Sequence, residues 1–597
     1  MIEVPGGILT GDPKEVAAFG DEVGRFRSGE WAPDAFVAYR TVHGVYGQRQ
    51  PDAHMVRVKI PLGILTTEML EVLGRIARDH AGHRRGHITT RESIQFHFTA
   101  LEDAAAIMGQ LAAVGLTTRE AGGNVVRNVT GSPLAGVCPR EPFDVTPYAA
   151  AYARHFLRHP LTQRLPRKFK SSFSCCEEDD TIADIQDLGF IPRVQTVEGE
   201  VRRGFMVKVA GGTSIFVRPA GVLSEFVSAG DYLRLSEAVL RVFNGCEELR
   251  HNRQRARLKY HVQRVGLEAF RAEVDQELHG PWAQQPVDME PLLTLPAGPE
   301  SPPCGVGTAP APGPGAGAPP DPDLATWLHR NAVTQRQPGF RAVVVRLPCG
   351  NVEADQFIGL AAIARRFGRG EVRLTPQQNL VLRWVDEEQL AKLRAALLGL
   401  GLGATANTLT DVTTCPGTDS CKLAITASME LARELSHGLA DLENIDELLD
   451  AVHIKVSGCP NGCGQHHVAG IGLEGATMRR GTAWVPCYHL YLGGSYSGGP
   501  ATGGGPGTRF GRRIGLRLPA KSALPAVRRT LLHYRDARQP GEAFGAFVTR
   551  LGPDTFQRLL SDLIEPPALG PGTVDFYRDS GRTALFRLER GEGECSA

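Results

Sequence analysis

The sequence predicts an α+β protein of two to four domains that contains two copies of one repeat. Three observations support this prediction. At 597 residues the chain is too long for one hydrophobic core. A strand–turn–helix–strand pattern occurs once on each side of a Pro/Gly-rich segment near the middle of the chain. Each copy is followed by a region in which a strand runs into a glycine pair, Gly211-Gly212 and Gly493-Gly494.

The repeat is visible in its strands, its turn and its helix. Residues 55–63 and 342–350 alternate like half-buried strands and end in a Pro-x-Gly turn. Helical stretches follow at Thr66–Ala77 and Ala354–Arg366, with apolar residues at three- and four-residue steps. Further strands then run through 88–98 and 374–384.

The two copies differ in their polar residues. Arg91 corresponds to Gln377, and His97 corresponds to Arg383. This difference predicts a single active site on the Arg91 side. The alternative is that these are exposed strand positions, free to vary.

The segment 296–322 is rich in Pro, Gly and Ala and is predicted to be a disordered linker. It divides the chain into predicted units: two half-domains at 30–115 and 323–405, two α/β domains at 121–295 and 411–570, and a C-terminal tail at 571–597. Helices are expected around Tyr232–Asn244 and Arg255–Leu278.

Four cysteines in the second half carry the strongest chemical signal. Cys415 and Cys421 form a C-x5-C pair, and Cys459 and Cys463 form a C-x3-C pair. Four thiolates are the ligand set of an iron–sulfur cube, and the Gly, Pro and Asn between the last two allow a sharp turn. Zinc is the rival metal, although its structural sites usually have shorter gaps. Unrelated thiols are the third possibility.

This cysteine pattern, with the sequence Gly-Cys-Pro-Asn-Gly-Cys-Gly-Gln-His-His at 458–467, resembles the sirohaem-containing sulfite and nitrite reductases. The resemblance implies a three-domain fold. Two ferredoxin-like half-domains pair about a pseudo-twofold axis, and two α/β domains bind the sirohaem and the iron–sulfur cluster. It also implies that Cys415, Cys421, Cys459 and Cys463 bind a [4Fe–4S] cluster, and that Cys463 bridges this cluster to the sirohaem iron.

Three basic phrases resemble family motifs in the family order: residues 89–91, 124–129 and 165–170. Sirohaem carries several carboxylates and the substrate is an anion, so the site needs cations that hold anions by charge-assisted hydrogen bonds. By the resemblance, the substrate-binding and proton-delivering residues are Arg91, Arg127, Lys168 and Lys170. The predicted cofactor-binding residues are Arg167, Asn128, Gln95 and Cys463. Glu92 departs from the glutamine usual in the family, which puts local hydrogen bonding in question.

Assimilatory sulfite reduction, by six electrons to sulfide, is the favoured prediction. The Lys168-Phe169-Lys170 phrase is typical of sulfite reductases in the family, and a more cationic site suits a dianion. Nitrite reduction to ammonia with the same cofactors is the alternative, because Gln465-His466-His467 is also common among nitrite reductases. A monooxygenase-type relative of corrin biosynthesis shares the scaffold, but the retained Arg/Lys set argues against it. A non-catalytic protein with a structural zinc site is a further rival.

Composition restricts the partners. The 66 basic and 65 acidic residues leave a net charge of +1, which argues against nucleic acid. No apolar run is long enough for a membrane span, no secretory signal is visible at the start, and 12 cysteines are too few for a disulfide scaffold. We expect a cytoplasmic monomer or weak oligomer. Without a nucleotide-binding fingerprint, its electrons are expected from a ferredoxin or a separate flavoprotein.

The remaining cysteines carry weaker expectations. Cys175 and Cys176 are predicted to be packing residues, with a redox role as the alternative. Cys595 is predicted to be an exposed thiol, with relay of product sulfur as the alternative.

Overall fold

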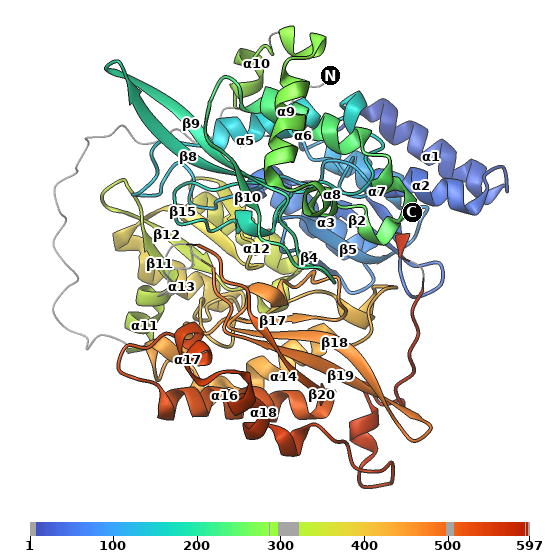
Figure 1. Ribbon diagram of the computed structural model, residues 1–597, viewed down its shortest axis with the longest axis vertical. Helices are drawn as coiled ribbons and strands as arrows, with labels where there is room; N and C mark the ends of the chain where they lie inside the picture. Colours follow the sequence, from blue (N-terminus) through green and yellow to red (C-terminus); the bar gives the residue numbers. More distant parts are fainter. Residues whose placement is uncertain (1–6, 286, 296–321, 497–506, 592, 595–597) are drawn as a thin grey trace.

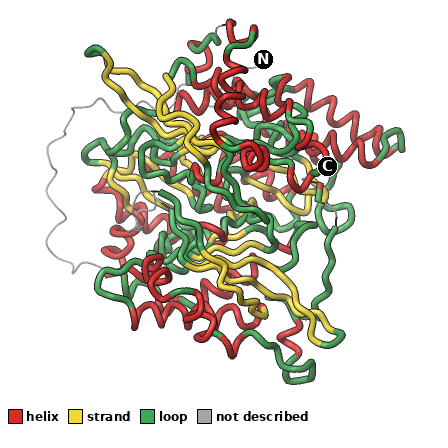
Figure 2. The backbone as a smooth tube through the Cα atoms, in the orientation of Figure 1, coloured by secondary structure: helices red, strands yellow, loops and turns green. Residues whose placement is uncertain are grey.

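The computed structural model describes residues 7–285, 287–295, 322–496, 507–591 and 593–594 (Figures 1 and 2). Most of the predicted linker, at 296–321, lies outside this part of the chain, and helix α11 begins at Pro322. Four five-stranded sheets organise the described residues, two in each half of the chain. No described helix combines the length and the apolar character that crossing a membrane requires.

The first half-domain contains a five-stranded sheet covered by helices. Its elements are α1 Pro13–Arg27, α2 Pro33–Val42, β1 Val45–Gly47, β2 His54–Val58, β3 Ile64–Thr66, α3 Thr67–His80, β4 Arg85–Ile88, β5 Ile94–Thr99 and α4 Ala104–Ala112. The second half-domain repeats the pattern. Its elements are α11 Pro322–Asn331, β11 Ala332–Thr334, β12 Phe340–Val345, β13 Asn351–Glu353, α12 Ala354–Phe367, β14 Glu371–Leu374, β15 Leu380–Asp386 and α13 Leu390–Gly399.

The two half-domains exchange one strand each. Strand β3 of the first copy pairs with β14 of the second, and β13 of the second pairs with β4 of the first. Helices α3 and α12 also pack on each other, and residues such as Leu73, Phe96, Phe357 and Leu382 share one core. The expected pseudo-twofold domain is therefore confirmed, and the exchange makes each copy depend on the other.

The exchange requires a backbone conformation that the Pro-x-Gly turn supplies. Leu62 and Gly63 have φ of 56° and 64°, and Cys349 and Gly350 have φ of 52° and 68°. This left-handed region favours glycine. The glycines also sit against backbone of the other copy, because a Cβ would lie 2.7 Å from the Leu374 carbonyl oxygen at Gly63 and 2.7 Å from the Ile88 carbonyl oxygen at Gly350.

The other two sheets share one topology. Their orders are β6-β7-β8-β9-β10 and β16-β17-β18-β19-β20, and in each the first two pairings are parallel and the last two antiparallel. Their strands are β6 Thr130–Gly131, β7 Ser171–Phe173, β8 Leu188–Val197, β9 Glu200–Val209, β10 Gly221–Ser228, β16 Thr413–Thr414, β17 Ile454–Ser457, β18 Ile471–Arg480, β19 Ala483–Leu492 and β20 Arg512–Pro519. The strands that precede the two glycine pairs are β9 and β19, and they occupy the same place in the two sheets, as expected.

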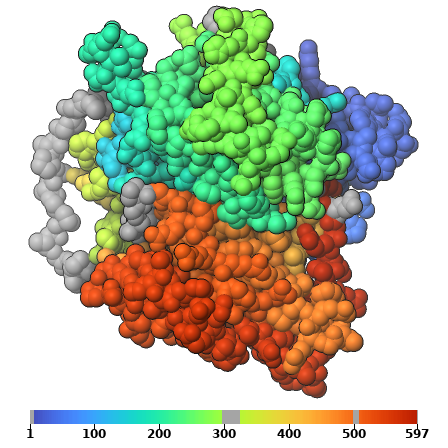
Figure 3. Space-filling model, in the orientation of Figure 1, coloured from blue at the N-terminus to red at the C-terminus, as the bar shows by residue number. Residues whose placement is uncertain are grey.

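Each of these sheets is covered by its own helices. In the first they are α5 Thr146–Phe156, α6 Tyr232–Gly245, α7 Glu248–His251, α8 Leu258–Val265, α9 Leu267–Leu278 and α10 Glu290–Leu293. In the second they are α14 Ser428–Gly438, α15 Glu447–Asp450, α16 Ala523–Ala537, α17 Phe544–Leu551 and α18 Pro553–Leu559. The helix expected at Arg255–Leu278 is two helices, because Gly266 with φ of 88° separates α8 from α9. Figure 3 shows the two α/β regions, green and orange, in contact along one face of the molecule.

The C-terminal tail is anchored where the structure describes it. Asp579 accepts a hydrogen bond from the Ala427 amide at 2.7 Å, just before α14. Glu594 forms a buried ion pair with Arg40 at 2.7 Å and a further pair with Lys422 at 2.8 Å. Cys595 lies outside the described residues.

We predict that Gly63→Ala and Gly350→Ala each lower the free energy of unfolding by about 1–3 kcal/mol, because each places a side chain at positive φ against the exchanged copy. Gly399→Ala is the control, since Gly399 is exposed and a Cβ there meets nothing within 4 Å. Thermal melting measures the change. Equal melting temperatures for all three variants would contradict the strand exchange.

A pH dependence follows from Asp579. Burial raises the pKa of this carboxyl from 3.8 to about 7, so the folded state binds the proton more tightly than the unfolded chain. Its contribution to stability is present below pH 4 and is lost as the pH rises to about 7. Asp579→Asn keeps a neutral group, so this variant should gain stability over wild type across that window, by up to about 1.4 kcal/mol per unit of pKa difference. Melting curves at several pH values measure the difference; exposed Asp575→Asn should show none.

Candidate metal and anion site

The four predicted cluster cysteines follow two short parallel strands. Cys415 comes directly after β16, and Cys459 comes two residues after β17. These strands pair in parallel, with Thr414 beside Val456. Because parallel strands end at the same edge of a sheet, the loops that hold the two cysteine pairs meet there.

The thiols of these loops lie within electrostatic reach of one another. Burial raises the pKa of Cys459 well above 9.0, and the thiols of Cys463, Cys415 and Cys421 raise it further. Such grouped thiols need a cation to become thiolates. The Gly458 amide already donates to the Cys415 sulfur at 3.3 Å, in the manner of an amide that stabilises a thiolate. The four thiols that the two loops bring together are the donor set of a [4Fe–4S] cluster.

Glycines allow the second loop to fold so closely. A Cβ at Gly458 would lie 2.7 Å from the Thr426 carbonyl oxygen, and one at Gly464 would lie 2.1 Å from the Val456 carbonyl oxygen. Gly462 has φ of 67° and packs against Thr213, which follows β9 in the first α/β region. The loop therefore lies between the two halves of the molecule. Of the four thiols, that of Cys459 is buried and that of Cys463 is exposed.

The turn that carries Arg91 contacts this loop directly. Thr90 donates from its hydroxyl to the Cys463 carbonyl oxygen at 3.0 Å. The Arg91 guanidinium donates to the Gln186 side chain at 2.8 Å and to the carbonyl oxygens of Asn128 and Ser171. Burial lowers the pKa of Arg91 to about 10, which leaves it cationic at neutral pH.

Arg127 and the two lysines come from neighbouring segments. The Arg127 amide donates to the Phe169 carbonyl oxygen at 2.9 Å, so the 124–128 segment runs beside the lysine phrase. Phe169 is buried while Lys168 and Lys170 are half-buried, as the predicted alternation requires. Burial lowers the pKa of Lys170, and Arg257, Arg91 and Lys168 lower it further, whereas Cys463 raises it. Lys170 therefore lies among these cations and close to Cys463.

Three of these cations have no direct ion-pair partner. Within the described ranges, Arg91, Arg127 and Lys170 form no ion pair with a carboxylate. Arg127 donates only to the carbonyl oxygens of Gly123 and Ala121 and to the Tyr46 hydroxyl. Partly buried positive charge without a carboxylate partner is costly unless an anion binds. The site is thus suited to an anion beside Cys463.

The structure adds two cations that the sequence did not single out. Arg257 forms an ion pair with Asp187 at 2.8 Å, and Asp187 in turn accepts from the Lys170 amide at 2.8 Å. Lys259 donates to the Thr213 carbonyl oxygen at 2.6 Å, beside the first glycine pair. The available signal was the basic run at 253–259, which contains both residues.

The three remaining predicted residues differ in their surroundings. Asn128 donates to the Ile60 and Arg91 carbonyl oxygens at 2.7 and 2.9 Å, and its own side-chain oxygen is buried without a partner. Arg167 is half-buried and donates to the Asn124 side chain at 3.4 Å. Gln95 lies on β5 and contacts His97 at 3.2 Å, and no hydrogen bond joins it to the described cysteine loops.

The structure shows which hydrogen bonds Glu92 makes in place of the glutamine that is usual in the family. Its carboxylate accepts from the Gly131 amide at 2.9 Å, and its other oxygen is buried without a partner. Gln378 occupies the equivalent position in the second copy and accepts from the Thr414 amide at 2.8 Å. Burial raises the pKa of Glu92 well above 4.5.

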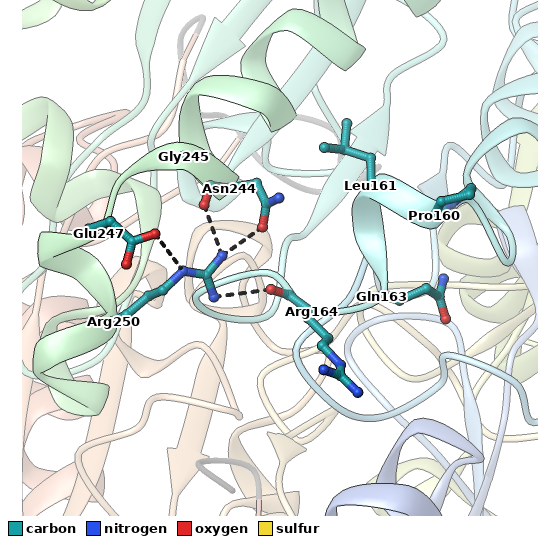
Figure 4. Close-up of a pocket in the computed structure, with 8 residues that line it drawn as sticks. All are labelled: Pro160, Leu161, Gln163, Arg164, Asn244, Gly245, Glu247 and Arg250. Atoms are coloured by element: carbon teal, nitrogen blue, oxygen red, sulfur yellow. Dashed lines mark hydrogen bonds and ion pairs between the residues drawn. The ribbon is translucent and has the colours of Figure 1, made fainter.

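A separate surface hollow of about 670 Å³ lies between the end of α5 and the end of α6 (Figure 4). Arg250 crosses it, donating to the Arg164 and Asn244 carbonyl oxygens at 3.1 and 2.8 Å. None of the predicted site residues lines this hollow, and it contains no cysteine. We assign it no role in the chemistry.

Comparison with protein families matches most of the chain. The family described as "Nitrite and sulphite reductase 4Fe-4S domain" matches residues 122–281 and 405–566. The family described as "Nitrite/Sulfite reductase ferredoxin-like half domain" matches residues 46–114 and 333–400. The two families thus alternate along the chain, as the two sheet topologies do.

Individual relatives extend over most of the chain as well. The ferredoxin–nitrite reductase of Synechococcus elongatus is 32% identical, over 74% of this chain and 80% of its own length. The sulfite reductase [ferredoxin] 2 of Mycolicibacterium paratuberculosis is 29% identical, over 84% of this chain and 82% of its own. The solved structure of the Mycobacterium tuberculosis NirA protein matches with a TM-score of 0.70 and 27% identity, covering 87% of this chain and 90% of that chain.

We predict that Cys459→Ser lowers the iron and acid-labile sulfide content of the purified protein at least tenfold, because it removes the buried thiol that the other three surround. Cys349→Ser is the matched control, a buried cysteine of the second half-domain that should leave both contents unchanged. Metal analysis and a sulfide assay measure them. Full iron and sulfide in Cys459→Ser would show that these cysteines are not the cluster ligands.

Proposed function

The chain belongs to the nitrite and sulfite reductase family, and from this premise we propose that it reduces nitrite to ammonium with six electrons drawn from a ferredoxin. Its cofactors are a sirohaem and a [4Fe–4S] cluster. The substrate and the donor are supported by the relatives, among them the ferredoxin–nitrite reductase of Synechococcus elongatus at 32% identity.

Cys415, Cys421, Cys459 and Cys463 are the proposed cluster ligands. They lie in loops that follow two parallel strands, and the other three thiols raise the pKa of Cys459. Cys463 is the proposed link to the sirohaem, because it is the exposed thiol and the cationic side chains lie beside it. When bound, the two cofactors would carry the electrons of the donor and supply the iron at which the oxyanion is reduced.

The observation that carries the proposal is uncompensated positive charge beside Cys463. Arg91 and Lys170 lie near this residue, and neither has a carboxylate partner in the described part of the chain. They are the proposed oxyanion ligands, with Arg127 and Lys168 behind them. Fixed cations in a site of low polarity stabilise negative charge far better than water does.

The reaction also consumes protons. Nitrite takes up six electrons and eight protons to give ammonium and two waters, so each departing oxygen must be protonated. The ammonium groups of Lys168 and Lys170 and the guanidinium of Arg91 offer N–H donors to these oxygens. Arg167 and Asn128 are the proposed holders of sirohaem carboxylates and polar edges. Gln95 is the weakest of these assignments, because its contacts lie within its own sheet.

Sulfite is the second candidate substrate, and the Lys168-Phe169-Lys170 phrase favours it. Sulfite carries more negative charge than nitrite, and the half-buried lysine pair increases the positive charge of the site. A sulfite reductase [ferredoxin] of Mycolicibacterium paratuberculosis is also among the relatives, at 29% identity. The same six electrons and eight protons convert sulfite to hydrogen sulfide and three waters.

The direct test is turnover of the purified holoprotein on both anions with one electron donor. We expect kcat/KM with reduced ferredoxin to be at least tenfold higher for nitrite, with ammonium as the product. A tenfold preference for sulfite would reverse the order of the two candidates. No turnover on either anion, in protein with full iron and sirohaem absorption, would contradict the proposed function.

A substitution at Lys170 distinguishes the two candidate substrates further. Lys170→Asn should lower kcat/KM for sulfite more than for nitrite, because removal of one cation costs a dianion more than a monoanion. We expect a difference of about tenfold between the two losses. Exposed Lys392→Asn is the control and should change neither. Equal losses on both anions would remove the argument that Lys170 selects by charge.

A further inference from the structure

Three cysteines of the first α/β region gather outside the site described above. The sulfur atoms of Cys138, Cys175 and Cys176 all lie within 4.8 Å of one another, and all three residues are buried. Cys138 lies in the loop after β6, and the other two lie just after β7. Buried thiols that converge from two separate segments are an ordinary arrangement for a metal and an unusual one for simple packing.

The strand register shows that this group occupies the pseudo-twofold counterpart of the cluster. Strand β6 pairs in parallel with β7, Thr130 beside Ser172, as β16 pairs with β17, Thr413 beside Lys455. Counting from these partners, Cys138 stands where Cys421 stands, and Cys176 where Cys459 stands. Both pairs are separated by 38 positions. The counterparts of Cys415 and Cys463 are Ser132 and Asp180.

The group nevertheless has the dimensions of a site for one ion. An iron–sulfur cube places its thiolates on different iron atoms, whereas a single tetrahedral zinc with Zn–S bonds of about 2.3 Å holds its sulfurs roughly 3.8 Å apart. The three sulfurs, all within 4.8 Å of one another, are compact enough for the second geometry. In the described ranges, the four cluster cysteines do not form a group of that tightness.

A buried carboxylate lies beside the three thiols. Ser132 contacts the Cys175 sulfur at 3.1 Å and the Asp180 carboxylate at 2.6 Å through its hydroxyl. Only 6% of Asp180 is exposed. Its other carboxylate oxygen is buried and has no hydrogen-bond partner among the described residues. A buried carboxylate oxygen without a partner is costly unless it meets a cation. The Asp180 carboxylate is not part of the group within 4.8 Å, so the three thiolates leave the fourth position of a tetrahedral zinc open beside it.

We propose that the first α/β region binds one structural zinc ion through Cys138, Cys175 and Cys176, with the fourth position on the Asp180 side. Binding displaces the three thiol protons to solvent, and no electron is transferred. The ion joins the 132–138 loop to the 174–180 loop. These loops flank the segments that position Arg91, since the Arg91 guanidinium donates to Ser171 and the Glu92 carboxyl accepts from Gly131. The zinc thus stabilises the two loops behind the anion site and takes no part in the reduction.

Zinc and iron content of the holoprotein test this proposal independently of activity. We expect wild-type protein, purified without chelators, to contain about one zinc per chain besides its iron. Cys176→Ser should lower the zinc content at least tenfold and leave the iron and sulfide unchanged. Cys246→Ser is the control, a buried cysteine of the same region outside the group, and should retain the zinc.

X-ray absorption at the zinc edge of the wild-type holoprotein keeps the test independent of how the variants fold. Three sulfur neighbours at about 2.3 Å and one lighter neighbour are expected. Absence of zinc after purification and after titration with zinc chloride would overturn the proposal. So would iron in place of zinc at this site, or a disulfide between these cysteines detected by mass spectrometry of the unreduced protein.

Discussion

Two short parallel strand pairs, β6–β7 and β16–β17, determine where the proposed metal-binding side chains of this chain lie. Each pair is only a few residues long, yet its parallel register brings two loops to one sheet edge. A register shift of one residue in β16–β17 would turn Cys415 and Cys459 to opposite faces. The strand exchange between the half-domains then fixes the Arg91 turn against the same edge, through the bond from Thr90 to Cys463.

The electrostatics of the site follow from that placement. Thiols and cations lie side by side, although each would be costly to bury alone. Thiolates that bind a metal, and a bound oxyanion, can therefore compensate the positive charge of the cations. Lys170 shows this most directly, because its neighbours are the cations Arg257, Arg91 and Lys168 together with the Cys463 thiol. The duplicated half lacks this arrangement, since Gln377 replaces Arg91. This difference is the basis for proposing one active site in a duplicated scaffold.

The sequence predicted the repeat, the cluster cysteines and the basic phrases because each is a local pattern of residue types. It did not predict the strand exchange, because the pairing of β3 with β14 depends on contacts between residues about 300 positions apart. The roles of Arg257 and Lys259 were missed for a similar reason: only the fold brings them to Asp187 and Thr213. Cys175 and Cys176 were predicted to be packing residues and Cys138 was not singled out, because Ser132 and Asp180 replace two cysteines of the cluster motif.

Anomalous diffraction from crystals of the holoprotein, recorded at the iron and zinc edges, tests the central claim most directly. The claim is that both parallel strand ends hold metal, and that only the second holds an iron–sulfur cluster. We predict iron density at Cys415, Cys421, Cys459 and Cys463, and a separate zinc peak between Cys138, Cys175 and Cys176. Iron density anywhere other than beside the first four cysteines, or no metal at either strand end, would contradict it.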